Sequence, residues 1–167
     1  MRLTHETALG RVVTLSSRRA ELARMTDVRA VESADEREDA FAVRRTVFVE
    51  EQDVDEELEY DEYEEESIHF VAYDGDEPIG AARLREPEPG LGKVERVAVL
   101  ESRRGEGVGL AVMNALEERA RGEELESLKL HSQTHAAPFY GRLGYERYGE
   151  VFEEAGIPHV KMRKSLE

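Results

Sequence analysis

Two arginines and three glycines within residues 103–109 have the residue types and spacing that most clearly serve chemistry in this chain. An alternating apolar run with β-branched Val94, Val97 and Val99 precedes them and predicts a strand. Apolar residues at helical spacing follow, at Val108, Val112, Leu116 and Ala120. Glycines let backbone N–H groups crowd around an anion, and the first turn of a helix offers more unpaired N–H groups. The run therefore predicts a phosphate-binding loop.

The loop differs from two well-known phosphate motifs. It has no GK[ST], so it does not match the loop that holds a nucleoside triphosphate with magnesium. Leu110 and Val112 occupy the places where a dinucleotide fingerprint would need its third glycine. The remaining pattern is Arg104-x-x-Gly107-x-Gly109. The alternative interpretation is an ordinary strand-to-helix turn with glycines for a tight bend.

This pattern resembles the pyrophosphate loop of the GNAT superfamily of N-acetyltransferases. A second motif, Ala136-x-x-Phe139-Tyr140-x-x-x-Gly144-Tyr145, resembles the family's Ala-x-x-Phe-Tyr-x-x-x-Gly-Phe. Gln133 stands where the family usually has an asparagine that contacts the pantetheine arm. Two landmarks in the right order favour this family over an ordinary turn.

Two further segments resemble the ElaA-like subgroup. Residues 44–52, RRTVFVEEQ, match its Arg-x-x-Val-Phe-Val-x-Glu-Gln segment, and residues 155–159, AGIPH, match its Gly-Ile-Pro-His tail. The resemblance therefore covers residues 28–162. It implies the reaction more firmly than the acceptor substrate, because membership of the subgroup does not settle that substrate.

The resemblance implies a mixed α/β fold, the GNAT acyl-CoA N-acyltransferase fold, with a strongly bent central sheet flanked by helices. It also implies acetyl-CoA as co-substrate. Backbone N–H groups near residues 97–99 would hydrogen-bond the pantetheine arm and the developing oxyanion. The expected cofactor-binding residues are Val97, Ala98, Val99, Arg103, Arg104, Gly105, Glu106, Gly107, Val108, Gly109, Gln133 and Phe139.

Acetyl transfer needs few catalytic groups, because the thioester is already activated. Tyr140 matches the family's phenol and is the predicted acid, since a hydroxyl donor at the thioester sulfur assists departure of the thiolate. The alternative is a packing tyrosine. Glu95 is the predicted base, acting directly or through water. It is equally compatible with an outward strand residue paired with Lys93 or Arg96.

Four residues are expected to line the acceptor pocket: Gln52, His69, His131 and His159. His69 and His131 are further candidates for the base, because imidazole titrates near working pH. The alternative for each is a satisfied core histidine, and His159 could instead lock the last strand. The histidines lack the short spacing of zinc ligands, so no metal is expected.

Composition excludes several classes of protein. The 167 residues, 40% of them hydrophobic, suit one domain with a sizeable core. No apolar run approaches the ~20 residues that span a bilayer, and the first residues do not resemble a secretory signal, so the cytoplasm is expected. The absence of cysteine excludes disulfides and thiolate chemistry. A net charge of −15 argues against a nucleic-acid partner.

The charged residues also predict an environment and a domain boundary. Only four of the 23 basic residues are lysine, and an acid-rich, lysine-poor chain is typical of a halophile's salt-loaded cytoplasm. Residues 1–24 carry five arginines and two glutamates, whereas the rest is strongly acidic. We therefore expect a flexible extension or a mis-assigned start over 1–24, and one N-acetyltransferase domain over 25–167. A targeting peptide is the alternative for the first segment.

The expected elements follow one another in a simple order. A strand at 28–31 is followed by a helix that a Ser33/Glu36 capping box opens and that runs to about 48. Strands at 67–73 and 78–85 form a hairpin, 86–92 is a loop, and the strand before the glycines comes next. The helix after the glycines runs to about 121. A strand at 125–132, a short helix at 136–143 and two closing strands complete the chain.

An acidic segment lies between the first helix and the second strand. Twelve of the seventeen residues 50–66 are Asp or Glu. A solvated loop or frayed helix is favoured over a specific cation site. The family places this segment beside the acceptor pocket, so its carboxylates could also attract an amine.

The leading hypothesis is an acetyl-CoA-dependent N-acetyltransferase that modifies a primary amine of a small molecule or peptide by direct attack. It is expected to act as a monomer or homodimer, without membrane or nucleic acid. A catalytically silent acyl-CoA-binding sensor is the first alternative. A phosphate-binding regulatory domain without thioester chemistry is the second.

Overall fold

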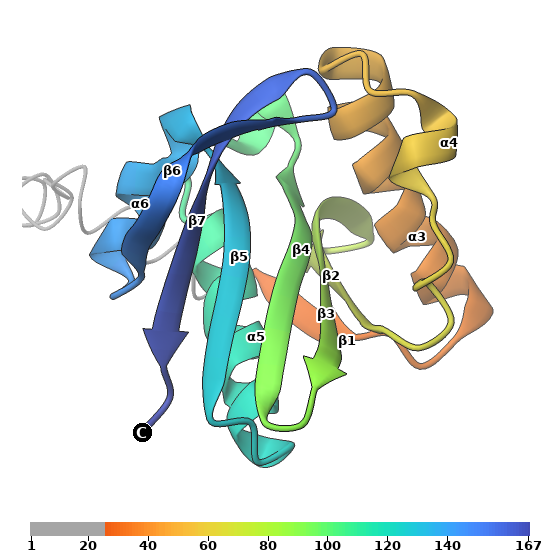
Figure 1. The fold of residues 1–167 in the computed structure, drawn as a ribbon. Helices are drawn as coiled ribbons and strands as arrows, with labels where there is room; N and C mark the ends of the chain where they lie inside the picture. Colours follow the sequence, from red (N-terminus) through yellow and green to blue (C-terminus); the bar gives the residue numbers. More distant parts are fainter. Residues whose placement is uncertain (1–25) are drawn as a thin grey trace, which may run out of the picture.

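A seven-stranded sheet with the order β1-β2-β3-β4-β5-β7-β6 forms the centre of the molecule (Figure 1). The computed structural model describes residues 26–167, so the predicted extension over 1–24 lies outside the described residues. The strands are β1 (Asp27–Ala30), β2 (Ile68–Asp74), β3 (Glu77–Glu88), β4 (Leu91–Val99), β5 (Ser127–Gln133), β6 (Glu146–Glu154) and β7 (Ile157–Ser165). Only β4 and β5 run parallel; the other neighbours are antiparallel. This confirms the predicted mixed α/β class.

Helices cover the two sides of the sheet. The helix α5 (Val108–Gly122) and the short α6 (Ala137–Arg142) lie on one side, here called the α5 face. The helix α3 (Ala34–Arg44), the π-helical turn η1 (Arg45–Glu51) and the short α4 (Glu56–Glu59) lie at the other side, the α3 face. Two 3₁₀ turns, η2 (Glu101–Arg103) and η3 (Thr134–Ala136), precede α5 and α6.

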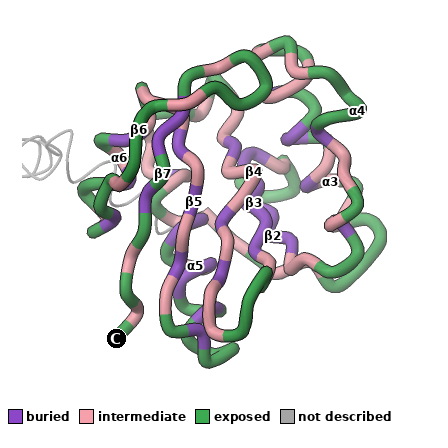
Figure 2. Tube along the Cα trace, in the orientation of Figure 1, coloured by how far each residue is buried: buried purple, intermediate pink, exposed green. Residues whose placement is uncertain are grey.

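The main core lies on the α5 face. Its buried strand residues include Phe70, Ile79, Leu84, Leu128 and Leu130. The α5 residues Val112, Met113 and Leu116 pack on them, as their helical spacing predicts. Figure 2 shows buried residues along α5 and the central strands, whereas the β6 edge is largely exposed. This packing fixes the start of α5 against the end of β4.

A smaller apolar cluster lies on the α3 face. Ala40, Val43 and Val47 pack against the sheet there. The sheet offers mostly small or β-branched side chains at this place, which lets the helix approach closely: Val71, Ala81 and Ala98, with Tyr73 beside them. The cluster covers only part of this face, and charged groups occupy the rest.

The predicted start of the first helix is confirmed. Ser33 caps α3, and its side chain accepts the N–H of Glu36 at 3.1 Å. The Glu36 carboxylate accepts the N–H of Glu32 at 2.8 Å rather than that of Ser33. The helical path continues beyond residue 48 as η1, which ends at Glu51 and places Gln52 directly after it.

The predicted loop over residues 86–92 is wrong. The strand β3 extends to Glu88 and β4 begins at Leu91, and these two residues are register partners across a tight turn. Gly90, with φ +82°, follows Pro89 in that turn, as a type II turn requires. The prolines suggested a loop, but β2 pairs with β3 no further than Leu84, so Pro87 removes no hydrogen bond to that neighbour.

Candidate active site

The two parallel strands at the centre of the sheet separate at their ends. The β4–β5 register pairs cover only Leu91 to Val94 and Ser127 to Leu130. Both strands continue, β4 to Val99 and β5 to Gln133, without register pairs between them. Arg96 has φ +58°, and the β3–β4 register shifts beside it. This bulge bends β4 away from β5. The gap exposes backbone groups of the predicted pantetheine segment, residues 97–99.

The glycine loop lies between the end of this gap and α5. Gly105 and Gly107 have φ +80° and +88°, a conformation that other residues adopt only with strain. Gly107 is the N-cap of α5, and no side chain caps the helix there. The N–H groups of the first turn are therefore left without a side-chain acceptor, which is the arrangement that binds an anion.

The two arginines of the loop form ion pairs with neighbouring segments. Arg103 pairs with Asp74 and, at 3.3 Å, with Glu106. Arg104 binds both carboxylate oxygens of Glu51, at 2.6 and 2.7 Å, and its Nε donates to the Val99 carbonyl at 3.1 Å. Hydrogen bonding to Arg104 holds the pKa of the Glu51 carboxyl below its usual range. The Glu51–Arg104 pair thus ties the end of η1 to the glycine loop.

Phe139 and Tyr140 lie beside the first turn of α5. A Cβ atom on Gly109 would lie 3.3 Å from the Phe139 ring, so glycine permits a close approach between α5 and α6. Tyr140 is 8% exposed, and its ring packs against Phe139 and Tyr145. Burial raises the pKa of Tyr140, so the phenol stays protonated at neutral pH and has a proton to donate. The geometry is compatible with the predicted acid and with its packing alternative.

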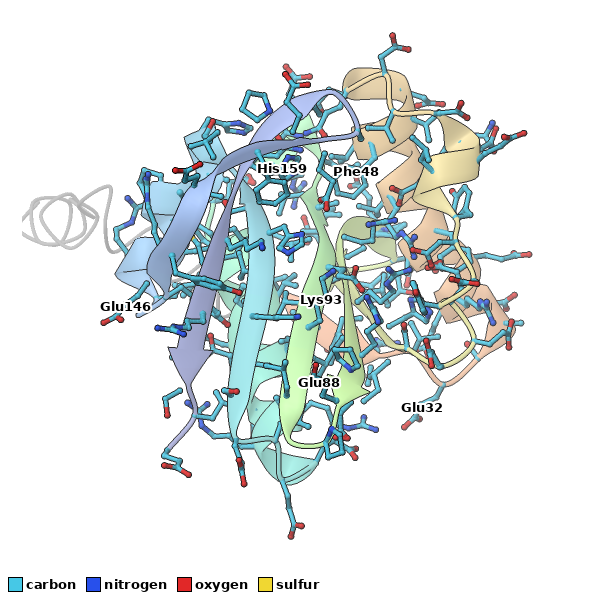
Figure 3. All side chains as sticks on the ribbon, viewed as in Figure 1. Glu32, Phe48, Glu88, Lys93, Glu146 and His159 are labelled. Carbon is cyan, nitrogen blue, oxygen red and sulfur yellow. The ribbon has the colours of Figure 1, made fainter. Side chains whose placement is uncertain are left out.

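Three of the four predicted pocket residues come together at the end of the gap. Gln52 and Gln133 join across the sheet, with Gln133 Nε2 donating to Gln52 Oε1 at 2.8 Å. Gln133 is the register partner of His159 on β7, and His131 lies two residues earlier on β5. Figure 3 labels His159 at the upper end of the sheet, with Phe48 of η1 across from it.

Glu154, which the sequence analysis did not single out, connects the two histidines. His131 Nδ1 lies 3.0 Å from one Glu154 carboxylate oxygen, and His159 Nε2 lies 3.7 Å from the other. The hydrogen bond to His131 holds the pKa of Glu154 below its usual range. Ala155 and Gly156 form the two-residue β6–β7 turn with positive φ, so a hairpin prediction over residues 153–158 would have placed Glu154 beside this pocket.

His69 lies away from the other pocket residues. It is on β2, two strands from β4, and its Nε2 contacts the Glu64 carbonyl at 2.8 Å. Its ring packs edge-on against Phe41, and burial lowers its pKa. His69 is therefore a core histidine, as the alternative interpretation predicted, but it is satisfied only at Nε2, because its buried Nδ1 has no hydrogen-bond partner within residues 26–167.

Glu95 lies on the α3 face with three cations around it. Its carboxylate accepts from Arg83 at 2.9 Å and Arg85 at 2.6 Å, and Lys93 lies 3.5 Å away. Burial alone raises the pKa of Glu95, but Arg83 and the other two cations outweigh it and leave the pKa below its usual range. A lowered pKa makes a carboxylate a weaker base. Of the alternative, the pairing with Lys93 is present, but the Glu95 side chain is only 12% exposed and does not point outward.

The acidic segment 50–66 is held by buried arginines, so the prediction of a solvated loop or frayed helix is wrong for its inner side. Arg44, fully buried, bonds Glu59 at 2.8 Å and Glu64 at 2.7 Å. Arg83, also fully buried, bonds Asp61 at 2.7 Å and contacts Glu64. We call these five residues, with Glu95, the ion-pair network. Among residues 26–167, no group of three or more acidic or histidine side chains is arranged to hold a metal ion.

Comparison with known proteins identifies the fold and the family. Residues 32–166 match the model of the acetyltransferase (GNAT) domain. The chain belongs to the GNAT acetyltransferase family. It is 50% identical to the uncharacterised N-acetyltransferase YjcF of Bacillus subtilis over 127 residues, which cover 75% of this chain and 90% of YjcF. The family and its named relatives support an N-acetyltransferase, and the seven-stranded mixed sheet is the family's fold.

Two solved structures extend the comparison of this acetyltransferase. Escherichia coli ElaA superposes with a TM-score of 0.73 and 26% identity, covering 83% of this chain and 97% of ElaA. An aminoglycoside 6′-N-acetyltransferase complexed with coenzyme A gives a TM-score of 0.68 at 18% identity, over 84% and 97% of the two chains, which shows the fold alone. No helix within residues 26–167 has the length and apolar character needed to cross a bilayer.

Proposed function

We propose that this GNAT protein transfers an acetyl group from acetyl-CoA to a primary amine of a small molecule or peptide by direct attack. One observation carries the proposal. The strands β4 and β5 separate after Val94 and Leu130, and the gap leads to an uncapped helix start preceded by two glycines with positive φ. An extended arm that ends in phosphates fits this combination of a backbone gap and an anion-binding loop. The neighbour solved with coenzyme A supports this reading of the shared fold.

The cofactor is proposed to bind mainly through backbone groups. Residues 105–109 would hold the pyrophosphate with their N–H groups, assisted by the dipole of α5. Arg103 and Arg104 add positive charge, although each already pairs with a carboxylate. Val97, Ala98 and Val99 would hydrogen-bond the pantetheine arm and the oxyanion from β4. Gln133 would meet the arm from β5, and Phe139 supports the first turn of α5.

Tyr140 is the proposed acid of the reaction. The amine attacks the thioester carbonyl, the tetrahedral intermediate collapses, and the carbon–sulfur bond breaks. The departing thiolate needs a proton, and a phenol with a raised pKa carries one at neutral pH. The Tyr140 hydroxyl forms no hydrogen bond with another residue of the described part of the chain, so it is free to donate to a ligand.

His131 is the proposed base, in preference to Glu95. The Glu154 carboxylate orients the His131 ring through Nδ1, which leaves Nε2 to accept the proton of the amine. Glu95 is held by Arg83, Arg85 and Lys93, and its lowered pKa reduces its basicity. Glu95 would then act as a positioning residue of the α3 face. Gln52 and His159 are proposed to line the pocket around the amine.

The first experiment is calorimetric titration of acetyl-CoA into the purified protein in molar KCl, with Gly107→Glu as the control. Micromolar binding that the substitution abolishes is expected, because a carboxylate would occupy the anion site. Absence of binding in both proteins would overturn the proposal. Release of free CoA can then be followed with a thiol reagent, and the protein contributes no background because it contains no cysteine. Binding without thiol release for any amine would favour the silent sensor.

The remaining expectations belong to the same proposal. We propose one catalytic domain over residues 25–167, of the ElaA-like subgroup, acting in the cytoplasm as a monomer or homodimer without nucleic acid or membrane. A halophilic origin is proposed from the charge of −15 and the low lysine content. Screening by salt would relieve the repulsion between the carboxylates of such a chain.

A further inference from the structure

Four basic residues form a row across the α3 face of the sheet. The register pairs join Arg85 on β3 to Lys93 on β4, Lys93 to Lys129 on β5, and Lys129 to Arg163 on β7. All four lie on the side opposite α5, because the intervening residues Leu128, Leu130 and Met162 fill the α5 core. Figure 3 labels Lys93, the second member of this row, on β4. We call these four residues the cation row.

One half of the cation row has carboxylate partners and the other half has none. Arg85 and Lys93 both pair with Glu95. Lys129 and Arg163 form no ion pair within residues 26–167, and Arg163 only stacks over the Tyr148 ring at 5.0 Å. Most basic side chains of the described residues do form ion pairs. The other exceptions are Arg142, Arg147 and Lys161.

This contrast requires an explanation, because the chain carries a net charge of −15 and has carboxylates in excess. Adjacent like charges on neighbouring strands repel and destabilise a sheet. Glu146 on β6 is the register partner of Arg163 but forms no ion pair with it, so the Lys129–Arg163 pair is costly unless a ligand supplies a closer negative charge. An anion between the two side chains would do so.

A hollow of about 790 Å³ lies over the unpaired half of the row. Lys129, Tyr148, Arg163 and Ser165 line it, and Glu88 and Glu146 stand at its two sides (Figure 3). The hollow is open to solvent on the face that α3 and α4 leave uncovered. It offers two cations, a phenol and a hydroxyl, which are suitable donors for a carboxylate or phosphate.

The hollow is next to the proposed reaction centre. Lys129 is two residues before His131 on β5, which is about 7 Å along a strand. The charges differ over this distance: the Glu154 carboxylate lies beside His131 near the end of the gap, and Lys129 and Arg163 stand one row away. A molecule with an ammonium group at one end and an anionic group about 7 Å away would meet an opposite charge at both ends.

We propose that the acceptor is an amine that also carries an anionic group, a carboxylate or a phosphate, which Lys129 and Arg163 bind. This inference rests on the proposed acetyltransferase function and names its substrate class. A peptide of two residues has this length, since two extended residues span at most about 7 Å. Its N-terminal amine would reach the end of the gap while its C-terminal carboxylate reaches the hollow.

The test compares matched acceptors that differ only in the anionic group. Short dipeptides with a free C-terminal carboxylate are compared with the same dipeptides as C-terminal amides, and phosphoethanolamine is compared with ethanolamine. The initial rate of CoA release gives kcat/KM for each. We expect the anionic member to be favoured by about 10- to 100-fold, which is typical of a charge-assisted hydrogen-bonded pair. The two series distinguish a carboxylate from a phosphate.

Variants assign the preference to the two side chains. The double substitution Lys129→Gln and Arg163→Gln is expected to remove the preference by lowering kcat/KM for the anionic acceptors only, mainly through KM. Arg142→Gln makes the same kind of charge change on an exposed residue of α6, and it should leave every rate unchanged. An unchanged acetyl-CoA affinity in the double variant shows that it is folded and separates acceptor binding from cofactor binding.

The outcomes separate this inference from the proposed function. Equal kcat/KM values for the two acceptors of each pair would overturn the inference. The protein would then be an acetyltransferase that does not select acceptors with an anionic group. The same follows if the protein binds acetyl-CoA but acetylates no anionic acceptor, or if the double variant keeps the preference. Loss of acetyl-CoA binding in the unmodified protein would instead overturn the proposed function.

Discussion

The two faces of the sheet contribute to the site in different ways. The α5 face is mainly apolar, and its parts of the candidate site are backbone conformations: two glycines with positive φ and an uncapped helix start, next to the separation of β4 from β5. The α3 face holds most of the buried polar residues, namely Arg44, Glu59, Glu64, His69, Arg83 and His159. Local rules thus build the proposed cofactor side, whereas long-range ion pairs build the proposed acceptor side.

The largest effect is expected from Arg83→Met, which removes the centre of the ion-pair network. Arg83 is fully buried and bonds Asp61, Glu64 and Glu95. The substitution leaves these carboxylates without their cation, and breaking a buried ion pair from one side costs about 3–5 kcal/mol. Urea unfolding measures the free energy of unfolding.

Arg142→Met is the control for this change, because Arg142 is exposed on α6 and should change stability by less than about 0.5 kcal/mol. A loss below about 1 kcal/mol for Arg83→Met would show that water replaces the ion pairs, and the contrast between the two faces would then disappear.

Tyr140→Phe tests whether the α5 face supplies chemistry as well as packing. The turnover number at saturating acetyl-CoA should fall by about 10²-fold, because the thiolate would leave without a proton donor. The affinity for acetyl-CoA should change little. Steady-state kinetics and calorimetry measure the two quantities.

Tyr145→Phe is the matched control for Tyr140. The two rings lie 5.8 Å apart, but the Tyr145 hydroxyl donates to Glu117 at 3.0 Å and has a structural partner. It should lower stability and leave turnover unchanged. Equal turnover in Tyr140→Phe and the unmodified protein would remove Tyr140 from the mechanism.

Gly107→Ala tests how far the glycine loop depends on its backbone conformation. Gly107 has φ +88°, and an alanine in this left-handed region is expected to lower the free energy of unfolding by about 1–2 kcal/mol. Thermal unfolding should show this loss, and acetyl-CoA should bind more weakly. Gly122→Ala, in the last turn of the same helix, should cost nothing or stabilise by up to about 1 kcal/mol. Similar losses for both glycines would mean that the loop conformation is not special.

As the pH is lowered, the free energy of unfolding is expected to fall first through a residue of the α3 face, His69. Burial lowers the pKa of His69 in the folded protein, so the unfolded chain takes up a proton on this residue at a higher pH. Stability is therefore complete above the ordinary histidine pKa of about 6.5 and falls as the pH drops below it. Between pH 7 and 5.5 the loss from His69 should be measurable in urea unfolding and at most about 1 kcal/mol, the limit for a histidine that stays neutral in the folded protein.

Substitution of His69 tests this origin. Asp61 and Glu95, whose pKa values are also lowered, lose their contributions only at a more acidic pH, near and below the ordinary carboxyl pKa of about 4. His69→Gln should therefore lose less stability between pH 7 and 5.5 than the unmodified protein. An identical loss in both would assign the pH dependence to another group.

The smallest effect is expected from salt. The melting temperature should rise by a few degrees between about 0.1 and 1 M KCl, because the Debye length shortens from about 10 to 3 Å and screens repulsion between exposed carboxylates. The buried ion-pair network should contribute little, since buried pairs are screened less. A melting temperature that does not rise with KCl would contradict the halophilic interpretation.

The predictions from sequence were accurate where a local pattern decides the structure. The Ser33 cap, the strand and helix around the glycines, and the β2–β3 hairpin all follow from short-range signals. The loop predicted over residues 86–92 was wrong because prolines and glycines end strands in general, but here Pro89 and Gly90 fit a tight turn. Whether such a segment forms a loop or a tight turn depends on which strands pair with its two ends, and this pairing is not visible in the local sequence.

Long-range placement was less accessible. The run of acids over residues 50–66 predicted a solvated segment, because the local sequence does not show which arginines bind these carboxylates in the folded protein. Arg44 and Arg83, which bind this segment, come from a helix and a strand outside it. Glu154 was likewise missed, since its link to His131 joins residues 23 positions apart.

The sequence by itself determined the family, the order of the elements and the glycine loop, because backbone conformation and apolar periodicity depend on residues that are close together in the sequence. Tertiary structure alone decided that the acidic segment turns inward to two buried arginines, that Glu154 orients His131, and that Lys129 and Arg163 stand side by side with no ion pair to any residue of 26–167. The physical reason is that an ion pair depends on distance in space. Sheet register, which sets that distance, is a property of the whole fold.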